Sequence, residues 1–347
     1  MLDRRGANPQ FPGRTRTAIF TMSNHNQPAK QFVVGHDDAP AALKGAVVAI
    51  GNFDGVHRGH RAVIAAAQRR AAEFGKPAAA LTFSPHPRVF LRPQNPHFQL
   101  NDDRAKLRLL AGAGLDGAIV MTFDQALAAT SAQDFVAKIL RGRFAISGAV
   151  LGFDFHFGKN RGGSPELLRE LGAQLGFTVD VVAPLEDEGR PVSSGAVRAA
   201  LTQGKVIEAR ELLGAPWFVS GEVVAGATRG RDLGYPTANM RLDPSCALKH
   251  GIYAVRANVG GKLIDGVASF GRRPTFDNGA PLLETFLFDF SGDLYGRQID
   301  VAFISWIRAE AKFDSIEALT KQMDADSAQA REALARAPHA FPVLGEI

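Results

Sequence analysis

An apolar run that enters a glycine-rich turn constrains this chain more than any other feature. The run covers residues 46–50 (AVVAI), the turn covers 51–60 (GNFDGVHRGH), and an alanine-rich helical pattern follows. We therefore expect a strand, a turn and a helix over 59–74, with His57 and His60 on one face of its first turn. Free backbone N–H groups, the positive end of the helix dipole and the glycines together favour an anion site, above all for phosphate.

The segments that follow repeat this alternation of strand and helix. Further strands are predicted at 31–34, 78–83, 117–121, 149–151 and 179–182, and further helices at 102–113 and 131–140. Such a rhythm is typical of a parallel, doubly wound sheet. Ligands of these sheets bind beyond the carboxyl ends of the strands, so the loop 84–87 (SPHP) is expected to share a cleft with the opening turn.

Three phenylalanines alternate with polar residues after the strand at 149–151. Phe153, Phe155 and Phe157 are separated by Asp154 and His156, and in an extended segment this spacing places the three rings on one face. Two interpretations are open: the edge of a core strand, or an apolar wall for a flat ring with Asp154 facing its polar part.

Two further stretches combine glycine or serine with basic residues. The loop 158–163 (GKNRGG) is either a phosphate loop or an ordinary turn. Residues 192–198 (VSSGAVR) open a helix that Ser193 or Ser194 can cap. Alternatively, Arg198 and these hydroxyl groups form a second clamp on phosphate.

The character of the chain changes near residue 214. Short strands without intervening helices are predicted downstream, at 218–224, 251–259, 262–269, 283–290 and 297–304, followed by one helix from Ser315. Such a series suggests a sandwich or a small barrel. The second half therefore forms a separate domain, with the boundary around 204–216.

This second half carries its own constellation of polar residues. In an extended segment Thr237 and Asn239 point the same way, and their oxygens are hard ligands suited to Mg²⁺ held together with substrate phosphates. The alternative is a loop in which these side chains bond to the backbone. Glu284, within an apolar strand, lies either on the solvent face or in a pocket as a general base.

Charge and composition narrow the class of protein. The formal net charge is +5, but lysine and arginine are dispersed, which argues against a nucleic-acid partner. Cys246 is the only cysteine, so no intrachain disulfide is possible. No apolar run approaches the roughly 18 residues of a membrane helix, and residues 1–30 lack a signal-peptide core. We expect a disordered tail at 1–30, with Met22 a candidate start, and a cytoplasmic protein. The sequence does not specify the oligomeric state.

Several of these motifs together carry a resemblance to a known family. The turn contains the HxGH signature of nucleotidylyltransferases, and with residues 82–87, 152–163 and 193–198 it resembles the FAD synthetase module of bacterial bifunctional riboflavin kinase/FAD synthetases. The second half resembles the riboflavin kinase module of that family at residues 234–239, 271–275, 293–296 and 312–314 and at Glu284. The likeness runs from about Phe32 to the C-terminal helix.

The resemblance implies two domains and two reactions. A Rossmann-like nucleotidylyltransferase domain would occupy 31–203, a linker 204–215, and a six-stranded β-barrel with a terminal helix 216–347. The barrel would phosphorylate riboflavin with ATP to FMN, and the first domain would adenylylate FMN with ATP to FAD, releasing pyrophosphate. Riboflavin, FMN and ATP are then the ligands, with Mg²⁺ as the metal.

The resemblance also assigns residues to the adenylyl transfer. The attacking FMN phosphate is already anionic, so positioning and charge stabilisation are needed rather than a base. His57 and His60 would donate to the phosphates, Arg198 would clamp them, and Asp154 and Phe157 would contact the flavin. The ATP- and phosphate-binding residues of the two domains would be Gly51, Phe53, Gly55, Gly59, Ser194, Gly230, Arg231 and Gly234.

For the kinase reaction a neutral hydroxyl attacks, so a base is useful. The resemblance gives that role to Glu284 and places Mg²⁺ on Thr237 and Asn239. Two positions depart from the family pattern: Gly195 replaces a threonine, and Ser269 stands where many members have asparagine.

Two alternatives are a chain with only its kinase active and a flavin-responsive binding protein. The first would follow from a weakened N-terminal half, but both histidines are retained. A binding protein needs no base, so the presence of Glu284 argues against the second.

Overall fold

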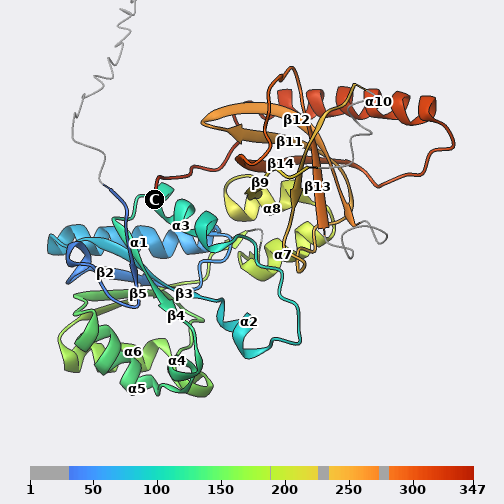
Figure 1. Cartoon of the computed structure of the whole chain (residues 1–347). Coiled ribbons are helices and arrows are strands. Elements are labelled where there is room, and N and C mark those ends of the chain that lie inside the picture. Colours follow the sequence, from blue (N-terminus) through green and yellow to red (C-terminus); the bar gives the residue numbers. More distant parts are fainter. Residues whose placement is uncertain (1–30, 188, 226–233, 273–280) are drawn as a thin grey trace, which may run out of the picture. The chain divides into compact units, whose positions relative to one another are not determined.

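The computed structural model describes residues 31–187, 189–225, 234–272 and 281–347 (Figure 1). The tail expected at 1–30 and the predicted phosphate-binding residues Gly230 and Arg231 lie outside these ranges. No helix within them combines the length and apolar character that crossing a membrane requires.

The first half forms a six-stranded parallel sheet in the order β1-β4-β3-β2-β5-β6. The strands are β1 (Val33–His36), β2 (Val47–Ile50), β3 (Ala78–Ser84), β4 (Gly117–Thr122), β5 (Gly148–Gly152) and β6 (Thr178–Val182). All four residues of β2 are buried, as expected for a central strand covered on both faces. The predicted doubly wound architecture is confirmed.

Helices cover both faces of this sheet (Figure 1). On one face lie α1 (Arg58–Phe74) and α3 (Asp103–Gly112), and α1 buries Val63, Ile64, Ala67 and Ala71 along one stripe. The other face carries α5 (Ala132–Asp134), η2 (Phe135–Arg143) and α6 (Pro165–Leu175). Ser131 caps α5 as predicted, but the chain continues as a π-helix where an α-helix was expected. Shorter helices are η1 (Ala41–Leu43), α2 (Pro87–Leu91), α4 (Gln125–Ala129) and η3 (Lys159–Arg161).

The strand order creates one crevice in the sheet. From β2 the chain moves through β3 to β4 on one side, whereas β5 lies on the opposite side of β2. Such a reversal separates the loops that follow two adjacent strands, here β2 and β5, and ligands of open α/β sheets bind in the opening. The loop with His57 follows β2, so the topology places it at this switch point.

The second half is a six-stranded antiparallel sheet in the order β10-β13-β12-β11-β14-β9. Its strands are β9 (Phe218–Glu222), β10 (Thr237–Arg241), β11 (Gly251–Val259), β12 (Lys262–Arg272), β13 (Pro281–Leu287) and β14 (Gln298–Arg308). Beyond β9, the Val224 amide donates to the Asn239 carbonyl oxygen of β10 at 2.8 Å. This bridge joins the two edges, so the sheet is a nearly closed barrel, as expected.

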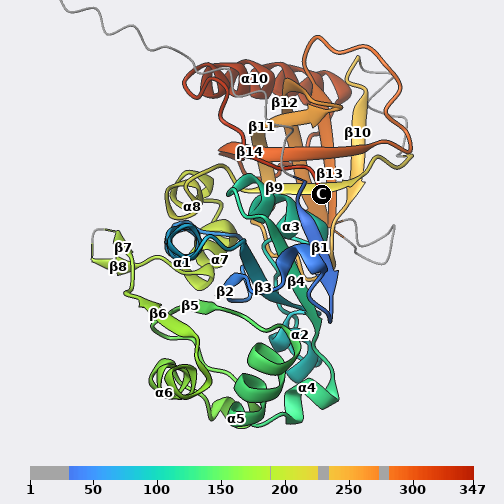
Figure 2. The same ribbon diagram turned by 90° about the vertical axis from the view of Figure 1, so that its left-hand side faces the viewer.

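Within the described residues, three helices pack around the barrel. The terminal helix α10 (Ile316–Ala335) is capped by Ser315 and lies along β11 and β12 (Figure 2). A short hairpin precedes the barrel, with two residues in each strand: β7 (Glu186–Asp187) and β8 (Arg190–Pro191). It is followed by the helices α7 (Ser194–Thr202) and α8 (Val206–Leu213). The segment predicted as a linker thus contains α8, whose apolar residues join the core of the barrel. The proposed domain limits stay predictions.

Candidate active sites

A cavity of about 820 Å³ opens at the carboxyl ends of β2 and β5. Loops after β2, β3 and β5 and the start of α7 line it, and it includes His86 and Pro87 of the loop expected to share the cleft. Most of the predicted residues of this half line it: Gly51, Phe53, His57, Gly59, His60, Asp154, Phe157, Ser194 and Arg198. Gly55 does not line the cavity. Its φ angle of 84° is left-handed, and it packs against Leu100.

The two histidines of the HxGH motif form a stacked pair. His57 caps α1, because its Nδ1 accepts a hydrogen bond from the His60 amide at 3.3 Å. The ring centroids lie 3.7 Å apart with an interplanar angle of 21°. Gly59 permits this arrangement, since a Cβ there would lie 3.1 Å from two atoms of the His57 ring. A side chain at this position would therefore crowd the His57 ring, which gives the glycine of the motif a steric role.

Both histidines are neutral at physiological pH. Burial, with a smaller contribution from the Arg198 charge, lowers the pKa of His57 from 6.5 to about 4. Burial and then the neighbouring His57 hold the pKa of His60 well below its usual value. Because Nδ1 of His57 accepts a hydrogen bond, the ring proton lies on Nε2. His57 can therefore offer an N–H donor to a phosphate without carrying a charge.

The loop before His57 holds a strained backbone. Phe53 and Val56 have positive φ angles of 51° and 42°, which non-glycine residues rarely adopt, and both are fully buried. The Phe53 ring meets His60 edge-on, with centroids 5.2 Å apart. Packing thus holds the loop in the conformation that orients the histidines.

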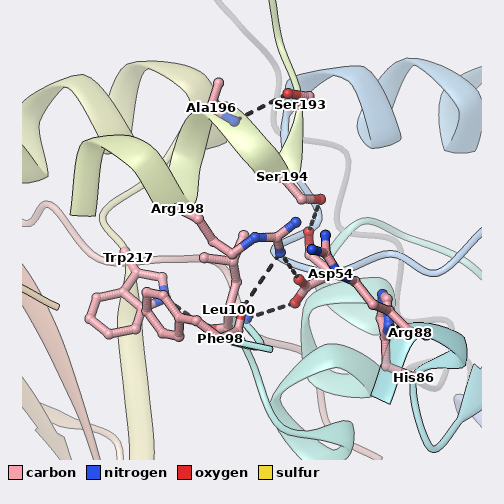
Figure 3. Close-up of polar contacts among 10 residues, drawn as sticks. All are labelled: Asp54, His86, Arg88, Phe98, Leu100, Ser193, Ser194, Ala196, Arg198 and Trp217. Carbon is pink, nitrogen blue, oxygen red and sulfur yellow. Dashed lines mark hydrogen bonds and ion pairs between the residues drawn. The ribbon is translucent and has the colours of Figure 1, made fainter. Parts of the chain in front are cut away.

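Asp54 organises the polar contacts of this site, and sequence reasoning missed it (Figure 3). Its side chain is 5% exposed. Its Oδ2 accepts from Arg198 Nη1 at 2.5 Å, its Oδ1 accepts from the Leu100 amide at 2.7 Å, and its carbonyl oxygen accepts from Ser194 Oγ at 2.8 Å. Burial raises the pKa of Asp54, and Arg198 opposes that effect. In the sequence, an aspartate beside glycine looks like an ordinary turn residue.

The two serines at the start of α7 have different roles. Ser193 is the cap and accepts from the Ala196 amide at 3.2 Å, whereas Ser194 donates to Asp54. Arg198, predicted as a phosphate clamp, lines the cavity and is also bonded to Asp54. A Cβ at Gly195 would lie 3.6 Å from Ser193 Oγ, an ordinary contact, so the missing threonine leaves no steric defect.

Asp54, His86 and His97 present potential metal ligands within 4.8 Å of one another. The Asp54 carboxylate is already bound by the Arg198 guanidinium, and His86 Nδ1 accepts from the Arg88 amide at 3.1 Å. Burial, His97 and the charges of Lys106, Arg198 and Arg88 lower the pKa of His86 to about 3. The charges of Arg198, Lys106 and Arg88 disfavour a metal ion at this cluster.

The three alternating phenylalanines follow a turn rather than an extended strand. The strand β5 ends at Gly152, and the Phe155 amide donates to the Gly152 carbonyl oxygen at 3.1 Å. Phe153 is 49% exposed, whereas Phe157 is 6% exposed and stacks against Phe155. All three phenylalanines line the cavity, as does Asp154. The backbone is not the extended one that period-2 spacing assumes, but the three residues are gathered at one site.

The second constellation forms a row across three strands of the barrel. Asn239 of β10 is paired with Glu284 of β13, which is paired in turn with Ser269 of β12. Directly opposite residues in an antiparallel pair share a face, with Cβ atoms about 5 Å apart. Glu284 is partly buried and alternates with the buried Leu283 and Thr285. It therefore lies on the outer face of the sheet, beside Asn239.

Asn239 has an unsatisfied oxygen. The residue is 3% exposed, and its Nδ2 donates to the Thr237 carbonyl oxygen at 3.1 Å. Its buried Oδ1 has no hydrogen-bond partner among the described residues. An orphaned amide oxygen beside a carboxylate fits a hard cation such as Mg²⁺. Of the glycines expected near this site, the structure describes Gly234, with a φ of 82° and open space around it.

Comparison with known proteins shows similarity over most of the chain. The FAD synthetase family model matches residues 39–196, and the riboflavin kinase model matches residues 213–334. A protein from Pseudomonas fluorescens named bifunctional riboflavin kinase/FMN adenylyltransferase is 39% identical over 310 residues, which are 89% of this chain and 99% of that protein. The chain belongs to the bifunctional riboflavin kinase/FMN adenylyltransferase family. The family resemblance read from the motifs is confirmed.

Other members show the same extent of similarity. The proteins of Escherichia coli K12 and Bacillus subtilis are 38% and 37% identical, covering 86% and 82% of this chain and 95% and 91% of their own lengths. A crystal structure described as a macrolide-efflux protein from Streptococcus pneumoniae has a TM-score of 0.78 and 32% identity, over 86% of this chain and 99% of that one. The efflux role in that description refers to that protein. Both halves of the riboflavin kinase/FMN adenylyltransferase fold are thus represented in one solved chain.

Proposed function

We propose that this chain phosphorylates riboflavin with ATP to give FMN and ADP, then adenylylates FMN with a second ATP to give FAD and pyrophosphate. The observation that carries this function is the presence, in one chain of this family, of both constellations. One is the cavity with the stacked His57 and His60, and the other is the row of Asn239, Glu284 and Ser269. Because both reactions consume ATP, we place the enzyme in the cytoplasm.

In the adenylyl transfer, the FMN phosphate attacks the α-phosphorus of ATP. No base is required, so the residues contribute orientation and stabilisation of developing negative charge. The neutral His57 and His60 donate to phosphate oxygens from the start of α1, while Ser194 and Arg198 contact the phosphates from α7. Support comes from the shared cavity and from the low pKa of His57, which is about 4.

The same cavity would hold the flavin of FMN. Asp154 and Phe157 follow β5 and line the cavity opposite the loop with the histidines. Gly51, Phe53 and Gly59 belong to the ATP side, where Gly59 allows the histidines to stack and Gly51 lies against the Phe53 ring. Gly55 does not line the cavity, but it packs against Leu100 and so helps to hold this loop.

In the kinase reaction, a riboflavin hydroxyl attacks the γ-phosphorus of the first ATP. Glu284 acts as the general base that accepts the hydroxyl proton. Thr237 and Asn239 would hold Mg²⁺, which neutralises charge on the phosphates. The orphaned Oδ1 of Asn239 supports this assignment. Gly230, Arg231 and Gly234 are proposed to contact the phosphates of this ATP.

The test is a time course with purified protein, riboflavin, ATP and Mg²⁺, followed by chromatography of the flavins. FMN should appear first and FAD after it. Accumulation of FMN without FAD would leave only the kinase. No turnover of riboflavin or of added FMN would contradict the enzyme and leave a flavin-binding protein. Replacing Mg²⁺ with a chelator should stop FMN formation.

A further inference from the structure

Trp217 is held firmly to the barrel, immediately before β9. Its carbonyl oxygen accepts from the Phe303 amide of β14 at 2.9 Å, and its ring stacks on the Phe303 ring with centroids 5.0 Å apart. The residue is 2% exposed. Main chain and ring are therefore both fixed by the same residue of the barrel.

The indole N–H of Trp217 points away from the barrel, toward the loop between α2 and α3. Nε1 donates to the Leu100 carbonyl oxygen at 2.7 Å, and Phe98 meets the indole edge-on with centroids 5.8 Å apart. Leu100 is 1% exposed, so this hydrogen bond is shielded from water. If a buried carbonyl oxygen loses its hydrogen-bond donor, the unpaired oxygen raises the free energy of the folded protein.

The same residue, Leu100, contacts the adenylyl-transfer site through its amide. That amide donates to Asp54 Oδ1, and Asp54 also accepts from Arg198 and Ser194 (Figure 3). Asp54 lies three residues before His57 in the strained loop. Hydrogen bonds to the amide and to the carbonyl oxygen of one residue, Leu100, thus connect Trp217 to residues that line the cavity.

Close packing makes this connection stiff. A Cβ at Gly55 would lie 2.6 Å from Leu100 Cδ1, so the loop and Leu100 are already in tight contact. A displacement of Leu100 therefore moves Asp54, and through it the Arg198 guanidinium. Buried, fully packed networks transmit such shifts because they lack space to absorb them.

We propose that Trp217, a residue of the kinase half, is a positioning residue for adenylyl transfer, acting through Leu100 and Asp54. This inference rests on the proposed function, since it concerns the FMN-to-FAD reaction. Trp217 does not touch the cavity, so it acts on the reaction only by fixing the Asp54 loop.

The test is Trp217→Phe, which removes the N–H and retains an aromatic ring against Phe303. The control is Trp306→Phe, the same change at the only other tryptophan; Trp306 lies on β14, and its Nε1 has no hydrogen-bond partner among the described residues. We expect kcat for FMN-to-FAD conversion to fall about 10-fold in Trp217→Phe. FMN formation by the same protein should stay within about twofold, and Trp306→Phe should match wild type for FAD formation.

A second measurement does not depend on activity. Hydrogen exchange followed by mass spectrometry should show faster exchange in peptides covering 52–60 and 96–101 of Trp217→Phe, and no change in Trp306→Phe. A double variant with Asp54→Ala should lose no more FAD formation than Asp54→Ala alone, because Trp217 acts through Asp54. If that variant does not fold, Asp54→Asn replaces it, and the double variant must then lose less than the product of the two single effects.

Three results would overturn the inference. The first is that Trp217→Phe and Trp306→Phe form FAD at the same rate and show the same hydrogen exchange. The second is that Trp217→Phe loses FMN formation and FAD formation equally. The third is that the loss of FAD formation in the double variant equals the product of the losses in the two single variants. A wild-type protein that forms no FAD from FMN would instead contradict the proposed function. The exchange experiment would then still decide whether Trp217 controls the Asp54 loop.

Discussion

The two sites of this chain are built in different ways. The proposed adenylyl-transfer site is a cavity of about 820 Å³ assembled from loops at the carboxyl ends of the strands of a parallel sheet. The proposed kinase site is a row of side chains across three paired strands of an antiparallel barrel. In the first, segments distant in sequence must be held in place by buried contacts such as Arg198 with Asp54. In the second, strand register alone sets Asn239 opposite Glu284.

The two proposed sites also differ in the nucleophile that each reaction uses. A phosphate nucleophile is already charged and needs no base, and the cavity offers neutral histidines and an arginine as hydrogen-bond donors. A hydroxyl nucleophile is neutral, and the row contains a carboxylate. In the proposed assignment the two ATP-dependent reactions use separate residues, so each reaction can be tested by a substitution that should leave the other unchanged.

The largest expected effect is that of Glu284→Ala. Loss of a general base typically costs about 10²- to 10⁴-fold, so FMN formation should almost stop while FMN-to-FAD conversion stays within about threefold. Separate assays that start from riboflavin and from FMN measure this. Glu222→Ala, at an exposed glutamate on β9, is the control. Equal loss of both activities would contradict the separation of the sites.

The reciprocal experiment is His57→Ala. Removing one preorganised donor to a developing negative charge costs about 10²- to 10³-fold, so FAD formation should fall by that factor while FMN formation is retained. His36→Ala, at an exposed histidine at the end of β1, should behave like wild type in both assays. A parallel fall in FMN formation would show that the histidine supports the fold or both reactions.

A smaller effect concerns stability and pH. His57 has a folded pKa of about 4 against 6.5 for an ordinary histidine, so below pH 6.5 the unfolded chain binds a proton that the folded chain does not. This contribution to stability is complete above pH 6.5 and is lost as the pH falls toward 4. At pH 4.5 the loss is about 2 to 3 kcal/mol.

Urea unfolding of wild type and His57→Gln at pH 7 and pH 4.5 measures this contribution. The variant should lose about 2 to 3 kcal/mol less than wild type between the two pH values. His86 and His97, with pKa values of about 3 and 4, add a common background to both proteins. Identical losses in the two proteins would mean that His57 is not held neutral by the fold.

The smallest expected effect is that of Gly195→Thr, which introduces the threonine that the family resemblance implies at this position. The added Cβ would make an ordinary contact with Ser193 Oγ at 3.6 Å, and Ser194 is already engaged with Asp54. We expect FAD formation to change by no more than about threefold, with FMN formation unchanged as the control. A rise of about 10-fold or more would show that the missing hydroxyl limits the reaction.

Much of the fold could be predicted from local pattern. The strand before the turn, the helix after it and the series of short strands from 218 onward follow from hydrophobic periodicity and glycine placement, and the structure contains them. Period-2 spacing after β5 predicted an extended backbone, whereas the strand ends at Gly152 and a turn follows, because such spacing alone cannot distinguish the two. The linker prediction missed α8, because its short apolar pattern between glycines resembles a loop.

The candidate sites divide in the same way. Residues within a compact motif, such as His57, Gly59 and His60, were found because their spacing alone places them on one helical turn. Asp54 was missed because its partners, Leu100 and Arg198, lie 46 and 144 residues away. Nothing in its local sequence distinguishes it from a turn aspartate.

By itself, the sequence determined most strands of the two sheets, the glycine-rich turn with the helix after it, and the family to which the chain belongs, because each depends on neighbouring residues. Only the tertiary structure decided that the histidines are neutral, that Asp54 holds Arg198, that Asn239 faces Glu284 and that Trp217 reaches Leu100. Burial and register arise when distant segments meet. They change the pKa of a side chain and the partners of a hydrogen bond without any local change in sequence.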